Sequence, residues 1–169
     1  MFGPYLLIYR RLKKEMVLME DEEILEEGKS RNALQKDAMT AIYDALTYQA
    51  MGQPIPVEDI VSSLCELPYE ECDYFVKAAL IAAIKFQADI IPLFNAKMRK
   101  WTFDRLNRVE QAILLLAYVH YYYVEPGVDK GVVIDIAVKQ SKSYLEEKDY
   151  KFVNAILDNV LESNAGKSE

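Results

Sequence analysis

Few side chains in this chain of 169 residues have the types and spacing that covalent chemistry needs. His120 is the single histidine, and the sequence around it suggests neither an orienting carboxylate nor a substrate pocket, both of which a general base requires. We therefore interpret His120 as a packing residue. The carboxylates are numerous but scattered, and their spacing marks no acid–base pair. The sequence predicts a protein that is not an enzyme.

Phosphate-binding and metal-binding patterns are equally weak. Gly28-Lys29-Ser30 resembles the end of a nucleotide-binding loop, but Glu23 stands where that loop needs its first glycine. Cys65 and Cys72 are the only cysteines, and their spacing indicates neither a disulfide framework nor a zinc site. We expect no cofactor and no metal.

Composition limits the remaining classes of function. Hydrophobic residues make up 51% of the chain, which is enough for a packed core. No apolar run reaches the roughly 18 residues that a membrane span needs, so a reduced, cytoplasmic protein without membrane contact is expected. The net charge of −7 argues against broad phosphate binding, so any nucleic-acid site must be local.

Apolar residues recur at helical spacing through most of the chain, which predicts an all-α fold. Pro92 lacks an amide hydrogen, so we expect a kinked or restarted helix there. Asn107 and Glu110 have the spacing of a capping box, and Asp129 is a candidate cap for the next helix. The expected helices cover about residues 34–51, 56–67, 70–86, 88–98 and 107–125, a segment from 129 onward, and 148–162.

The chain divides into an acidic extension over residues 1–30, a helical domain over 31–162 and a polar tail over 163–169. Six acidic residues between positions 20 and 27 repel one another, which is typical of a solvated or disordered segment. Lys14-Glu15 can be encoded by a ribosome-binding purine run, with Met19 three codons beyond it. Two interpretations stay open: Met19 is the true first residue, or residues 1–18 form a genuine N-terminal helix.

Three segments together resemble a known family. They are Trp101-Thr102-Phe103-Asp104-Arg105-Leu106, the helix over 109–118, and Phe152-Val153-Asn154 with Leu157-Asp158. In this order and spacing they resemble the NusB family of bacterial transcription antitermination factors, of which the chain looks like a divergent member. The resemblance implies about seven helices in two packed, perpendicular bundles. It also implies a factor of the transcription elongation complex that joins ribosomal protein S10 (NusE) and binds single-stranded boxA RNA.

The resemblance also suggests which residues bind RNA. The family begins with an arginine-rich stretch, of which only Arg31 and Lys36 remain here, so weakened RNA binding is expected. Lys139, Lys142, Lys148 and Lys151 lie around the junction of the last two helices, where Phe152 adds an aromatic ring. These residues are candidates for a small basic and aromatic RNA surface. The alternative is that the lysines are merely solvated and that Phe152 belongs to the core.

For S10 the resemblance carries over Tyr43 and Glu110, and it leaves open a homodimer that hides the RNA face. One alternative function is a NusB-like interaction module that has lost RNA binding and uses the tyrosines at 118 and 121–123, some of which must face outward. Another is the RNA-binding appendage of rRNA cytosine methyltransferases. Methyl transfer itself is not expected, because the sequence holds no Rossmann-like glycine motif or catalytic cysteine region.

Overall fold

The computed structural model describes residues 29–167 and contains α-helices, short 3-10 and π-helical turns, and no strand in that part of the chain. The all-α prediction is confirmed. Residues 1–28 of the acidic extension, and with them the question of Met19, lie outside the described residues. The elements are α2 (Arg31–Ala50), α3 (Val57–Cys65), η2 (Tyr69–Glu71), α4 (Tyr74–Lys97), η3 (Phe103–Arg105), α5 (Arg108–Val119), η4 (His120–Val124), α6 (Lys130–Tyr144), α7 (Glu147–Val160) and α8 (Asn164–Lys167).

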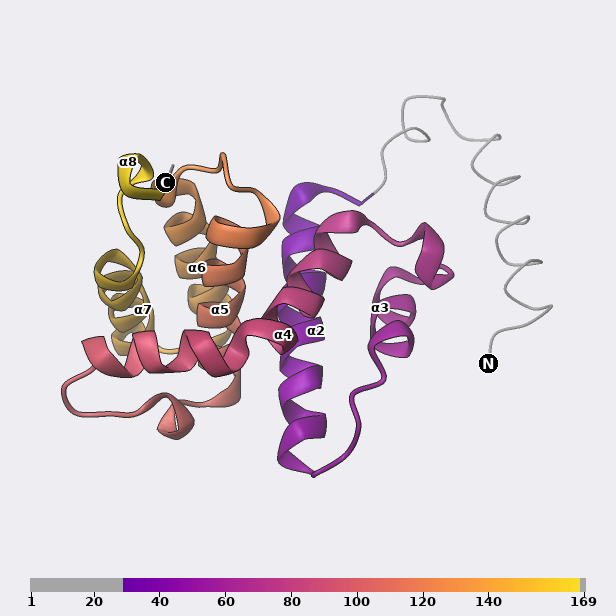
Figure 1. Cartoon of the computed structure of the whole chain (residues 1–169), viewed down its shortest axis with the longest axis horizontal. Helices are drawn as coiled ribbons and strands as arrows, with labels where there is room; N and C mark the ends of the chain where they lie inside the picture. The colour runs from indigo at the N-terminus through magenta and orange to yellow at the C-terminus, as the bar shows by residue number, and fades with distance from the viewer. Residues whose placement is uncertain (1–28, 168–169) are drawn as a thin grey trace.

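The helices form two packed groups (Figure 1). One contains α2, α3 and the first part of α4; the other contains α5, α6 and α7, with the second part of α4 crossing beside them. Helix α2 packs on both α4 and α5, so it joins the two groups. None of the described helices is both long and apolar enough to cross a membrane.

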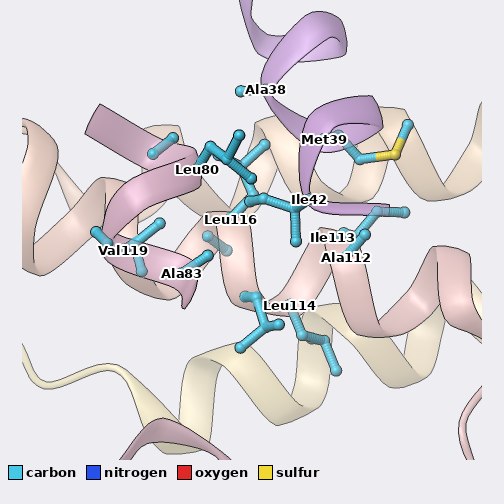
Figure 2. Packing of buried hydrophobic residues seen from close by; sticks show 14 of the residues in the cluster. Ala38, Met39, Ile42, Leu80, Ala83, Ala112, Ile113, Leu114, Leu116 and Val119 are labelled. Atoms are coloured by element: carbon cyan, nitrogen blue, oxygen red, sulfur yellow. The ribbon is translucent and has the colours of Figure 1, made fainter. Parts of the chain in front are cut away.

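Helix α5 is the centre of the core. Its residues from Ala112 to Ala117 are each at most 3% exposed, so the helix is enclosed on every side. Its neighbours are α2, α4, α6 and α7. Figure 2 shows Ile42, Leu80 and Leu116 packed together on one side of α5, with Leu114 on the opposite side. An all-round apolar surface of this kind requires burial within a larger assembly of helices.

Pro92 does not restart a helix. Helix α4 continues through it to Lys97, so the expected division into two helices is wrong, although Figure 1 shows α4 changing direction along its length. Pro92 is exposed, which places its ring and the lost hydrogen bond at the solvent side. Ile90 and Phe94 are 1% and 0% exposed and anchor both sides of the proline in the core.

Two helix starts show how the loops are fixed. The side chain of Asn107 accepts a hydrogen bond from the backbone N–H of Glu110 at 2.8 Å, which confirms the predicted start of α5. Asp129 precedes α6 as expected, but its side chain does not cap the helix. Asn164 does so instead: its side-chain oxygen accepts from the N–H of Lys130 at 3.0 Å, and its amide donates to Asp129.

The described part of the C-terminal tail packs on the end of η4. Tyr121 is fully buried, and its hydroxyl donates to the carbonyl of Glu162 at 2.7 Å. The ammonium of Lys167 lies 3.5 Å from the centre of the Tyr121 ring and donates to the carbonyl of Val128 at 2.7 Å. Residues 163–167 therefore belong to the packed structure.

Leu114→Ala tests the central position of α5. Leu114 is fully buried, so the substitution leaves a cavity and should lower the free energy of unfolding by roughly 2–5 kcal/mol. Leu93→Ala removes the same atoms from a side chain that is 47% exposed and is the matched control. Urea denaturation gives both values, and equal losses would contradict this description of the core.

Candidate nucleic-acid interface

A groove lies between the first turns of α2 and the outer face of α6. Arg31, Lys36 and Lys139 line it, so the fold brings together cations that are more than 100 positions apart in the sequence. The side-chain amide of Gln140 donates to the carbonyl of Gln35 at 3.0 Å and ties the two helices together. The other lining residues are Asn32, Val132, Asp135, Ile136, Ser143 and Tyr144.

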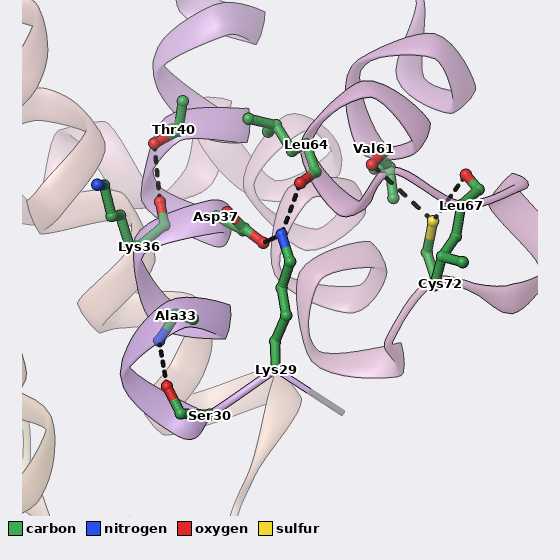
Figure 3. Close-up of polar contacts among 10 residues, drawn as sticks. All are labelled: Lys29, Ser30, Ala33, Lys36, Asp37, Thr40, Val61, Leu64, Leu67 and Cys72. Carbon is green, nitrogen blue, oxygen red and sulfur yellow. Dashed lines mark hydrogen bonds and ion pairs between the residues drawn. The ribbon is translucent and has the colours of Figure 1, made fainter. Parts of the chain in front are cut away.

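The start of α2 is held by a cap and an ion pair. Ser30 caps the helix by accepting from the N–H of Ala33 at 3.2 Å. Lys29 pairs with Asp37 at 2.7 Å and donates to the carbonyl of Leu64, which links α2 to α3 (Figure 3). In Figure 3, Lys36 lies on the opposite side of α2 from Lys29. Lys29 is therefore committed to the fold, whereas Lys36 faces the groove.

A second hollow lies between the start of α5 and the start of α7. It brings together three predicted site residues, Glu110, Lys148 and Phe152. Phe152 was predicted either to belong to an RNA surface or to lie in the core. It is half-buried, because it packs against the core and also lines the hollow. The hollow is also lined by Trp101, Arg105, Leu106, Asn107 and Asp149.

A shallow depression connects the groove and the hollow. It shares Ser143 and Tyr144 with the groove, and Asn107, Lys148 and Asp149 with the hollow. The three depressions form one path from the start of α2, across the α6–α7 junction, to the start of α5. We call this the α2–α5 path.

Two predicted RNA-binding lysines lie outside this path. Lys142 is exposed on α6, with its ammonium 5.2 Å from the centre of the Tyr150 ring. Lys151 is exposed on α7 and pairs with Glu147 at 2.8 Å, one helical turn away. Neither side chain lines any of the three depressions. The α2–α5 path therefore contains four of the six residues that were predicted to bind RNA: Arg31, Lys36, Lys148 and Phe152.

Glu110, predicted to contact the partner, is 5% exposed. One of its carboxylate oxygens accepts from the side-chain amide of Asn107 at 3.3 Å. Burial, and next the negative charge of Asp149, raise the pKa of Glu110 to about 7, against the opposing effects of Asn107 and Lys148. Glu110 lines the hollow, so this is where a partner can approach it.

Tyr43, the other predicted partner residue, lies elsewhere. It is a half-buried residue of α2, and the guanidinium of Arg108 stands 5.8 Å from the centre of its ring. Arg108 also donates to the hydroxyl of Thr47 at 3.1 Å, so the cation is held over the tyrosine. Tyr43 lines none of the three depressions that make up the path, so the structure does not bring the two predicted partner residues into one depression.

His120 has a carboxylate partner, which its sequence context does not predict. Its Nε2 lies 3.2 Å from a carboxylate oxygen of Glu125, because the π-helical turn η4 brings the two side chains together. Glu125 also pairs with Arg31 at 3.2 Å. The imidazole is 1% exposed and packs edge-on against Phe75, so it is a packing residue, and burial lowers its pKa despite Glu125.

The tyrosine-rich end of α5 is mostly internal. Tyr121 is buried, and Tyr118 and Tyr122 are half-buried. Only Tyr123 of this group is exposed, at 42%, and its ring stacks on Phe86 with the centroids 4.3 Å apart. The expectation that some tyrosines face outward is confirmed for this one residue.

Sequence reasoning predicted Phe152 but missed two other aromatic residues of the path, Trp101 and Tyr144. Trp101 is 56% exposed and Tyr144 is 48% exposed, although an apolar type normally signals the core. Trp101 stands out in the sequence only as part of a motif. Tyr144 is the last residue of α6, where helical periodicity ends and gives no signal.

Over residues 29–167 these features define a helical scaffold whose central helix is enclosed from Ala112 to Ala117. A polar path on its surface carries cations and exposed aromatic rings. The sequence profile of the NusB family matches residues 84–162. Transcription antitermination protein NusB of Finegoldia magna is 33% identical over 94 residues, which cover 56% of this chain and 68% of that protein. NusB of Elusimicrobium minutum is 26% identical over 133 residues, which cover 78% of this chain and 92% of that protein.

The fold is similar to that of T. maritima NusB, with a TM-score of 0.66 and 24% identity over 84% of this chain and 99% of the other. The chain belongs to the NusB family.

The raised pKa of Glu110 predicts a pH-dependent stability. Between the ordinary value of 4.5 and about 7 the folded state holds a proton that the unfolded state has released. The free energy of unfolding should therefore fall as the pH rises through this window, by up to about 1.4 kcal/mol per pH unit. Glu110→Gln removes this decline.

Urea denaturation at pH 5 and pH 8 measures the effect. The stability of Glu110→Gln relative to the wild type should increase between the two pH values. Glu58→Gln changes an exposed carboxylate on α3, and its free energy of unfolding should differ from that of the wild type by the same amount at both pH values. If the difference in unfolding free energy between Glu110→Gln and the wild type were the same at pH 5 and pH 8, burial would not be holding a proton on Glu110.

Proposed function

We propose that this protein is a transcription antitermination factor that acts together with ribosomal protein S10 and holds boxA-type single-stranded RNA along the α2–α5 path. The observation that carries the proposal is the convergence of Arg31, Lys36 and Lys139 at one end of a continuous path with aromatic rings along it. Cations that follow a phosphate backbone and rings that stack on unpaired bases are the two elements of single-strand binding. The names of the relatives support the same process.

The charge balance favours joint binding with a partner. The path carries Arg31, Lys36, Lys139, Arg105 and Lys148, but also acidic residues, of which Asp135, Glu146 and Asp149 are examples. A chain of net charge −7 with such a mixed path has little sequence-independent affinity for RNA. S10 supplies the missing positive charge in the assembled complex.

Tyr43 and Glu110 remain the proposed contacts with S10. Tyr43 offers a ring edge and a hydroxyl on α2, with Arg108 over its ring. Such a half-buried aromatic residue next to an arginine is typical of residues that dominate protein interfaces. The elongation complex is the proposed setting, and a cytoplasmic location follows from it. No bond-making step is assigned to this chain.

The double variant Lys36→Gln and Lys139→Gln tests the RNA path. Removing two phosphate contacts should weaken binding of boxA RNA roughly tenfold at low salt and reduce the magnitude of the log–log salt slope by about 1.4. Fluorescence anisotropy across a salt series, with and without S10, measures both. Lys85→Gln alters an exposed lysine on α4, outside the path, and should change neither. An unchanged slope in the double variant would exclude this path.

Glu125→Gln tests whether the ion pair restrains Arg31. Glu125 lies 3.2 Å from Arg31 and competes with phosphate for that guanidinium. The substituted glutamine keeps the hydrogen-bonding shape but removes the charge, so RNA should bind a few-fold more tightly, with a steeper salt slope. The same anisotropy series gives the answer, and weaker binding would mean that Glu125 positions Arg31 for RNA.

A further inference from the structure

We propose that Glu125 couples RNA binding at Arg31 to protonation of His120, so that the protein takes up protons when a phosphate displaces Glu125 from Arg31. This inference deepens the proposed function and rests on it for the identity of the ligand. It gives a role to the single histidine of the chain, which RNA binding itself does not use.

One carboxylate connects the surface with the interior. One oxygen of Glu125 lies 3.2 Å from the guanidinium of Arg31, and the other lies 3.2 Å from Nε2 of His120. The Arg31 side chain is 71% exposed, whereas that of His120 is 1% exposed. Because solvent screens a buried group only weakly, a change in the ion pair at the surface alters the environment of the buried imidazole.

The π-helical turn η4 fixes the carboxylate beside the ring. The N–H of Glu125 donates to the carbonyl of His120 at 3.1 Å, so the backbone holds the two residues together. The imidazole packs edge-on against Phe75, with the ring centres 4.9 Å apart. The contact between Glu125 and His120 therefore persists when Arg31 moves to another partner.

Arg31 lies between two depressions and has a side chain long enough to serve either. It lines the groove together with Lys36 and Lys139, and it also lines a smaller depression that contains Glu125. Arg31 is the first residue of α2, and its guanidinium offers the paired donors that a phosphate accepts. A phosphate in the groove can therefore take the guanidinium from Glu125 without disturbing the helix.

Both electrostatic effects of a bound phosphate favour the protonated imidazole. Burial is the main cause that lowers the pKa of His120; Glu125 raises it, and the positive charge of Arg31 lowers it. A phosphate that pairs with Arg31 neutralises that charge and leaves Glu125 to His120 alone. The pKa of His120 should therefore rise when RNA binds. By linkage, RNA affinity should increase as the pH falls through the range in which His120 titrates.

The other charged groups near His120 keep their contacts. Lys167 of α8 also lowers the pKa of His120, and its ammonium is held 3.5 Å from the centre of the Tyr121 ring. Asp73 lines the smaller depression and caps α4 through its side chain. Within residues 29–167 neither group forms an ion pair with Arg31. Both effects are therefore constant while Arg31 changes its partner.

The single histidine makes the experiment direct, because its imidazole signal needs no assignment by mutation. NMR follows this signal in isotope-labelled, full-length protein from pH 5 to pH 8, without RNA and saturated with boxA RNA, in a buffer free of phosphate. We expect RNA to move the midpoint of the titration to higher pH. Glu110 also lies on the path and has a pKa of about 7, so the histidine signal and not the affinity decides.

Two variants test the coupling, one of them without RNA. Arg31→Gln removes the competing charge and should raise the His120 midpoint in the free protein. Lys36→Gln removes the same charge from the groove but has no contact with Glu125, so it is the matched control and should leave that midpoint unchanged. Glu125→Gln removes the bridge, and it should lower the midpoint and abolish the shift caused by RNA.

An equal midpoint in RNA-free Arg31→Gln and RNA-free wild type would overturn the coupling, whether or not RNA binds. RNA binding that leaves the wild-type midpoint unchanged would also overturn it, and the proposed function would stand. If Arg31→Gln raised the midpoint but the wild type bound no RNA, alone or with S10, the proposed function would fail, and with it RNA as the ligand that drives the coupling.

Discussion

The enclosure of α5 is the constraint on which the rest of the structure depends. The stretch from Ala112 to Ala117 is apolar on all sides and must be surrounded, and α2, α4, α6 and α7 do this from both helical groups. Because all four pack on the same helix, their relative positions are fixed. The first turn of α5 therefore lies beside α7, and the turn that follows its last residue lies beside α2. The path between these ends is a consequence of the core.

Polar groups decide how the two ends of α5 meet the surface. At the start, Asn107 satisfies the backbone of the helix and also bonds the buried carboxyl of Glu110. At the other end, η4 presents Glu125 to both His120 and Arg31. Buried or half-buried charges are retained only where they are paired or neutralised. The carboxyl of Glu110 consequently keeps its proton up to about pH 7, and Glu125 holds Arg31 in an ion pair.

The sequence predicted the fold class, the main helices and the cap of α5, because apolar periodicity and capping are local signals. It failed where the outcome depends on tertiary contacts. The continuation of α4 through Pro92 depends on anchors at Ile90 and Phe94, and the cap of α6 comes from Asn164, 34 positions away. The π-helical turn that joins His120 to Glu125 has no sequence signature. In the candidate site, the cations Arg31, Lys36 and Lys148 could be predicted from the sequence. The exposure of Trp101 could not, because residue type alone does not show whether a side chain is buried.

The packing of residues 163–167 has a practical consequence for protein engineering. Asn164 provides the first hydrogen bond of α6, and Lys167 covers the ring of a fully buried tyrosine. Deleting these residues would uncap one helix and uncover the interior in a single step. Affinity tags, reporter fusions and crystallisation truncations should therefore leave everything up to Lys167 intact.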